Sequence, residues 1–108
     1  MKFSRIMYVE RKAGGVTGDA RIGRVTFSRT MRSMYYDGKE YLKVNNGFKY
    51  NCLERETGEE YWISGCKANG DDTLYGGNKP IPIDEDVREE YWTIIRKLPE
   101  LKDKPYSN

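Results

Sequence analysis

The segment MYYDGKEYL, residues 34–42, decides the fold, because it carries a hairpin turn and two strand patterns together. Asp37-Gly38 is a two-residue loop of the type that accepts positive φ at both positions, and tyrosine-rich runs flank it. The sequence therefore predicts a β-hairpin with three facing pairs: Tyr36 with Lys39, Tyr35 with Glu40, and Met34 with Tyr41. The first and third of these pairs lie on the same side of the sheet.

Strand patterns also precede the hairpin, at residues 3–9 (FSRIMYV) and at residues 20–30 (ARIGRVTFSRT). The first run mixes β-branched, aromatic and long apolar side chains without a helical stripe. In the second run Val25 and Phe27 alternate with polar residues, whereas Ile22 is out of phase with them. We expect a β-bulge at Gly23, since one inserted residue would restore the phase.

After the hairpin, residues 47–65 (GFKYNCLERETGEEYWISG) repeat the strand–turn–strand form. Apolar residues alternate along both strands, and a turn is expected at Thr57-Gly58. Cys52 falls on the same side as Phe48 and Tyr50, so we predict that it is a small buried apolar residue.

The pattern changes to a helical period from Asp84 onward. Asp84 is a good N-cap, acidic residues follow it in the first turn, and basic residues lie in the last turn, as the helix dipole favours. We predict a helix from about Glu85 to Leu98, ended by Pro99. Its apolar stripe consists of Val87, Tyr91, Ile94 and Leu98, widened by Ile95.

Together these elements predict an α+β fold: a strongly bent antiparallel sheet or small open β-barrel of five or six strands, with one C-terminal helix. Residues 1–100 form one domain, and residues 101–108 form a loose C-terminal tail because they carry no pattern. The predicted core is Ile6, Val25, Phe27, Phe48, Tyr50, Ile63, Tyr91, Ile94 and Leu98.

Composition limits the classes of protein to which the chain can belong. Charged residues make up 33% of the 108-residue chain. No run approaches the roughly 20 apolar residues that span a bilayer, and charges interrupt the N-terminal segment too often for a signal peptide. We therefore predict a cytoplasmic protein without membrane contact. In that reducing compartment Cys52 and Cys66 should be free thiols.

Charge is divided unevenly along the chain. Residues 1–54 hold 11 Lys and Arg against 5 Asp and Glu, a net charge of +6. Residues 55–108 hold 8 against 12, a net charge of −4. Two interpretations stay open: the halves fold against each other and neutralise one another, or the first half supplies a basic binding face.

The glycine-rich stretch EYWISGCKANGDDTLYGG, residues 60–77, is either a set of turns or a loop that contacts a ligand or partner. Its candidate contact residues are Trp62, Lys67, Asp71 and Asp72. Catalysis is disfavoured, because no histidine is available as a base and only Lys67 could lower the pKa of the Cys66 thiol. The spacing fits neither a calcium loop nor a phosphate-binding loop, so we predict no metal, cofactor or catalytic residue.

Four stretches, KFSRIMYVE, ARIGRVTFS, ETGEEYWISGCK and IDEDVREEYW, resemble a family of small uncharacterised bacterial proteins of about this length. The similarity covers nearly the whole chain and implies no activity at particular residues. Some members bear the name 1-deoxy-D-xylulose-5-phosphate synthase. That enzyme resembles transketolase, a much longer chain that binds thiamine diphosphate through a GDG motif. Residues 69–72 here read NGDD and the chain has no histidine, so the sequence argues against this activity.

Three functions remain as expectations. The first is a small binding module that contacts a protein partner. The second is binding of single-stranded nucleic acid, because basic and aromatic side chains that could contact phosphates and bases lie close in sequence: Arg21, Arg24, Arg29, Arg32, Tyr35 and Tyr36. The third, which the lack of histidine disfavours, is an enzyme subunit whose site is shared across a homo-oligomer.

Overall fold

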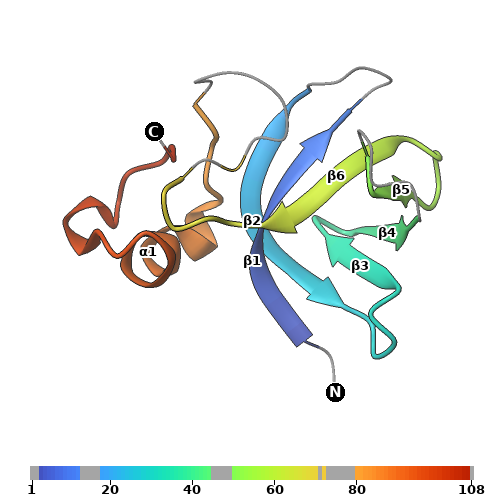
Figure 1. Ribbon diagram of the computed structural model, residues 1–108, viewed down its shortest axis with the longest axis horizontal. Helices are drawn as coiled ribbons and strands as arrows, with labels where there is room; N and C mark the ends of the chain where they lie inside the picture. The colour runs from blue at the N-terminus through green and yellow to red at the C-terminus, as the bar shows by residue number, and fades with distance from the viewer. Residues whose placement is uncertain (1–2, 13–17, 45–49, 71, 73–79, 108) are drawn as a thin grey trace.

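Six β-strands and a C-terminal helix make up the fold in the computed structural model, which describes residues 3–12, 18–44, 50–70, 72 and 80–107. The strands are β1 (Phe3–Arg11), β2 (Ala20–Phe27), β3 (Ser33–Tyr36), β4 (Lys39–Lys43), β5 (Cys52–Glu54) and β6 (Glu60–Gly65). Each strand pairs antiparallel with the next, and β6 returns to β1, so the sheet closes into a barrel (Figure 1). The predicted α+β fold is confirmed, with six strands and a closed barrel.

The hairpin at residues 34–42 has the predicted register. Tyr36 lies opposite Lys39 and Met34 opposite Tyr41. The turn residues Asp37 and Gly38 have φ values of 53° and 77°, as a two-residue turn of this type requires. The turn predicted at Thr57-Gly58 is also present, since the Gly58 N–H donates to the Glu54 carbonyl at 2.8 Å.

The predicted bulge at Gly23 is wrong. Pairing between β1 and β2 runs without interruption from Phe3 opposite Phe27 to Glu10 opposite Ala20. Ile22 and Val25 are both fully buried although they point to opposite faces of β2. The phase break therefore reflects burial on both faces of the strand, because the C-terminal region covers the outside of the barrel here (Figure 1).

The apolar side chains form two clusters, one on each side of the β1–β2 pair. The cluster inside the barrel consists of Met7, Val9, Val25, Phe27, Met34, Tyr36, Tyr41, Cys52, Tyr61 and Ile63. The cluster between the barrel and the C-terminal region consists of Ile6, Tyr8, Ala20, Ile22, Ile81, Ile83, Val87, Tyr91 and Trp92. Of the predicted core, Tyr50 and Leu98 are only half-buried, and Phe48 lies outside the described residues.

The C-terminal helix is shorter than predicted. It runs through a 3-10 turn η1 (Glu85–Val87), one α-turn α1 (Arg88–Glu90) and a π-turn η2 (Tyr91–Ile95). The Arg96 N–H donates to the Tyr91 carbonyl five residues back at 3.0 Å, and this wider turn rotates the following side chains relative to an α-helix. Ile94 is consequently 65% exposed, and its predicted place in the core is wrong.

The C-terminal segment joins the sheet at the edge of β2. Only the end of β2 pairs with β3, at Thr26 and Phe27. The Ile22 N–H donates to the Pro82 carbonyl, and the Asp84 N–H donates to the Ile22 carbonyl. Within the segment predicted as a loose tail, the Pro105 carbonyl accepts from the Ile83 N–H at 2.8 Å. A further turn, η3 (Pro99–Leu101), precedes this contact. Among the described residues, no helix has the length and apolar character needed to cross a bilayer.

Candidate binding sites at the two ends of the barrel

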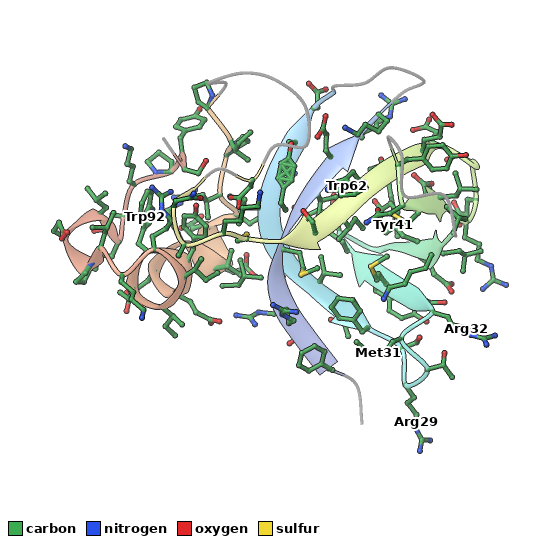
Figure 2. The ribbon with its side chains drawn as sticks, in the orientation of Figure 1. Arg29, Met31, Arg32, Tyr41, Trp62 and Trp92 are labelled. Atoms are coloured by element: carbon green, nitrogen blue, oxygen red, sulfur yellow. The ribbon has the colours of Figure 1, made fainter. Side chains whose placement is uncertain are left out.

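The four arginines predicted as a cluster lie in two different settings. Arg21 forms an ion pair with Asp84 at 2.6 Å, and Arg24 forms one with Glu90 at 2.7 Å. Both acidic partners belong to the C-terminal region. Arg29 and Arg32 lie instead at the exposed turn between β2 and β3, where their side chains point away from the barrel (Figure 2).

The ion pairs support the interpretation that the two halves of the chain neutralise one another. Arg11 donates to Glu59 through Nε at 2.5 Å and through Nη2 at 3.0 Å. Like the pairs of Arg21 and Arg24, this contact joins a cation of the first half to an acid of the second. Pairs this exposed contribute little to stability because solvent screens them, but they occupy the carboxylates that would otherwise repel a polyanion.

The two candidate tyrosines lie on opposite faces of β3. Tyr36 is buried inside the barrel, and its hydroxyl donates to Asp84 Oδ2 at 2.6 Å. Burial, together with this carboxylate, raises the pKa of Tyr36. Tyr35 is half-buried on the outer face, opposite Glu40 of β4. The structure therefore does not bring these two rings and the four arginines onto one surface.

Exposed cations and apolar side chains surround the end of the barrel where β2 turns into β3. We call this surface the basic end; it consists of Phe3, Arg29, Met31, Arg32, Leu42 and Lys43. The turn is held by the Ser28 side chain, whose Oγ accepts from the Ser33 N–H at 3.1 Å. Met31 has a φ of 64°, which is uncommon for a residue other than glycine.

Contacts around Phe27 connect the members of the basic end. The Phe3 ring lies 5.7 Å from the Phe27 ring, and Lys43 Nζ lies 5.6 Å from the centre of the same ring. The Lys43 N–H donates to the Arg32 carbonyl at 3.0 Å. Within the described part of the chain, no carboxylate lies within 4.0 Å of the charged nitrogens of Arg29, Arg32 or Lys43.

A cavity of about 170 Å³ opens at the other end of the barrel. We call it the tyrosine mouth. Its floor is formed by the buried side chains of Val9, Tyr36, Tyr41 and Tyr61, and its rim by Arg11, Asp19, Arg21, Asp37 and Lys39. The sequence indicated Tyr36 and Arg21 as contact residues but not Tyr61 or Arg11, although alternation along their strands places all of them on the inner face.

The candidate loop residues after β6 are spread between the surface and the interior. Trp62 is half-buried on the outer face of β6, opposite Glu10. The Lys67 N–H donates to Asp72 Oδ1 at 2.5 Å, with Asp72 buried and the Lys67 side chain exposed. Asp71 lies outside the described residues. Gly70 has a φ of 79°, so a turn is confirmed at this position.

Both cysteines are free thiols, as predicted. Burial raises the pKa of Cys52 to about 12. Burial and the Asp72 carboxylate also raise the pKa of Cys66. The sequence offered only Lys67 to lower the pKa of the Cys66 thiol, but the structure opposes such an effect, since both thiols are held in the protonated form that reacts slowly.

A buried polar cluster on the outer face of β1 was not predicted from the sequence. Glu10 is 3% exposed and Lys12 only 1%. Lys12 Nζ lies 3.1 Å from Glu10 Oε2, and the Tyr8 hydroxyl donates to Glu10 Oε1 at 2.7 Å. The Gly18 N–H also donates to this carboxylate, at 2.8 Å. The spacing of Tyr8, Glu10 and Lys12 was the available signal, because alternate residues of a strand share one face.

No family model, curated protein or solved structure matches this chain. The resemblance to the small bacterial proteins therefore stays a prediction. Among the described residues, no group of three acidic, cysteine or histidine side chains is placed to hold a metal ion. The two ends of the barrel are consequently the candidate sites of function.

Proposed function

We propose that the protein is a small cytoplasmic binding module whose basic end docks onto an acidic segment of a protein partner. One observation carries this proposal: exposed cations without a neighbouring carboxylate alternate with exposed apolar side chains on that end. The remainder of the barrel scaffold positions this surface and takes no part in the contact.

The charge of the basic end favours an acidic partner. Arg29, Arg32 and Lys43 have exposed side chains and are not neutralised by an ion pair among the described residues. Arg21 and Arg24, by contrast, each already pair with a carboxylate of the C-terminal region. A negatively charged partner that approaches the basic end therefore meets cations that are still available for pairing, and their charge would also accelerate its association.

Apolar side chains on the same end favour a protein over a nucleic acid. Phe3 is 49% exposed, Met31 39% and Leu42 38%. Arginine, methionine and aromatic residues are enriched at the cores of protein interfaces, where the apolar parts become buried. A phosphate backbone has no apolar side chains to cover them.

The arrangement of tyrosines weakens the alternative of single-stranded nucleic acid. That hypothesis requires bases to stack beside the arginines that bind phosphates. Tyr36 is buried inside the barrel, and Tyr35 lies on β3 and is not one of the residues of the basic end. An enzyme subunit with a site shared across a homo-oligomer stays a weaker alternative, since the sequence contains no histidine to act as a base near neutral pH.

The proposal can be tested with a charge reversal and a matched control. The variant Arg29→Glu/Arg32→Glu changes the basic end, and Lys97→Glu/Lys102→Glu makes the same change in net charge at exposed positions elsewhere. Partners are captured from the native cytoplasm, treated with nuclease, and reconstituted with purified protein. We expect the first variant to lose the partner and the second to keep it.

A second measurement identifies the chemistry of the contact. A peptide of alternating glutamate and leucine should compete with the captured partner, whereas a lysine–leucine peptide should not. Binding that survives Arg29→Glu/Arg32→Glu would contradict the proposal. Saturable binding of mixed-sequence single-stranded DNA at low salt, lost in the same variant, would replace it with the nucleic-acid alternative.

A further inference from the structure

The tyrosine mouth has the size of a site for one small ring. Its volume is about 170 Å³, close to the roughly 150 Å³ of an apolar protein cavity that admits benzene. The rings of Tyr41 and Tyr61 meet edge to face, with centres 4.7 Å apart, and both are buried. Together with Val9 they present an apolar floor against which a flat ring can pack.

The cations on the rim are held in place by partners outside the cavity. Glu59 accepts two hydrogen bonds from Arg11, and Asp84 accepts one from Arg21. Each guanidinium has five N–H donors, so these contacts orient the group and leave other donors for a ligand. The Arg11 and Arg21 side chains are 47% and 55% exposed, which keeps these donors accessible.

Carboxylates share the same rim. Asp19 and Asp37 are both exposed residues that line the cavity. These carboxylates would repel a ligand that carries only a negative charge, and the arginines would repel a ligand that carries only a positive charge. A head group that carries both charges can satisfy the two sets at once, as electrostatic complementarity requires.

We propose that the tyrosine mouth binds a small zwitterion that carries one aromatic ring, the chemistry of an aromatic amino acid. The ring packs on Tyr41 and Tyr61. The ligand carboxylate accepts hydrogen bonds from Arg11 and Arg21, and its ammonium group donates to Asp37 and Asp19. The site is separate from the basic end, so it does not depend on the protein partner proposed above.

Titration calorimetry with four related probes tests the charge and ring requirements. Phenylalanine has the ring and both charges, phenylpropionate lacks the ammonium group, phenethylamine lacks the carboxylate, and glycine lacks the ring. We expect saturable binding of phenylalanine, binding at least about tenfold weaker for either singly charged probe, and none for glycine. Each tenfold loss corresponds to about 1.4 kcal/mol.

Two rim variants then assign the charges. Arg11→Gln should weaken phenylalanine and phenylpropionate but not phenethylamine, and Asp37→Asn should weaken phenylalanine and phenethylamine but not phenylpropionate. Asparagine tolerates the positive φ of Asp37, so the turn is retained. Glu40→Gln, which lies on the outer face of β4, is the control and should change nothing.

The outcomes distinguish this proposal from that for the basic end. Arg29→Glu/Arg32→Glu should bind phenylalanine as the unmodified protein does, whatever its effect on the protein partner. The proposal is overturned if phenylalanine shows no saturable binding at millimolar concentration. It is also overturned if the two singly charged probes bind as tightly as phenylalanine, or if Glu40→Gln has the same effect as the rim variants.

Discussion

Replacing Lys12 with methionine should leave the Glu10 carboxylate buried without its ammonium partner. The ammonium nitrogen and the carboxylate lie 3.1 Å apart, and both side chains are almost fully buried. Methionine keeps a similar length and apolar stem but removes the charge. Breaking a buried ion pair at one partner costs about 3–5 kcal/mol, so we expect Lys12→Met to lower the free energy of unfolding by that amount at pH 7.

Urea unfolding of both proteins at pH 7, followed by circular dichroism, measures this loss of stability. Lys102→Met is the control, because Lys102 is exposed and its replacement should change stability by no more than about 0.5 kcal/mol. A loss below about 1 kcal/mol for Lys12→Met would refute the reasoning.

Three further predictions concern the strand glycines, the thiols and the synthase name. Gly23→Ala would place a Cβ 2.3 Å from Asp84 Oδ2 and 2.5 Å from the Tyr36 ring, so it should cost about 1–3 kcal/mol in thermal or urea unfolding. Gly65→Ala, whose Cβ meets only Arg5 Nη2 at 3.5 Å, should cost much less, and an equal loss would contradict the argument. Burial raises the pKa of Cys52 to about 12 and also raises the pKa of Cys66. Both thiols should therefore react with a labelling reagent at pH 8 far more slowly in the folded protein than in the urea-unfolded protein. Rapid labelling of Cys66 would show that its surroundings are open. Thiamine diphosphate with magnesium should not raise the melting temperature, and a rise that grows with its concentration would revive the synthase assignment.

Local signals predicted the hairpins because all the residues that determine them are adjacent in sequence. Asp37-Gly38 specifies the turn, and alternation then fixes which side chains point into the barrel. The same rule failed at Gly23, because periodicity alone cannot distinguish a bulge from a strand that is buried on both faces. Residues 81–107 cover the outer face of β2, and no local sequence pattern connects these residues to that strand.

The C-terminal helix also departs from what its local sequence pattern predicts. An α-helical period placed Ile94 in the core, but the π-turn at Tyr91–Ile95 shifts the following positions. Asp84 occupies the predicted N-cap, yet its side chain binds Arg21 and Tyr36 and makes no capping hydrogen bond among the described residues. The second deviation depends on tertiary contacts rather than on intrinsic propensity.

The candidate sites were predicted only in part. Arg29 and Arg32 were named from the sequence and lie together at the basic end, whereas Arg21 and Arg24 are paired with acids far along the chain. Such pairings cannot be read from charge counts, which give the balance between halves but not the partners. The tyrosine mouth could not be predicted from the sequence, because the cavity forms only when the barrel closes and the pairing of β1 with β6 brings Arg11 opposite Tyr61.

The pairing of β2 with residues 82–84 has a consequence for how the chain folds as it is synthesised. All six strands leave the ribosome before Pro82, so for that interval the first half of β2 has an open edge beside Ile22. The outer apolar faces of Ile6 and Tyr8 are uncovered over the same interval. Contacts between segments so far apart in sequence form slowly, because a long loop must close before these contacts stabilise the fold. The nascent chain is therefore most prone to aggregate after its strands have emerged and before its last residues arrive.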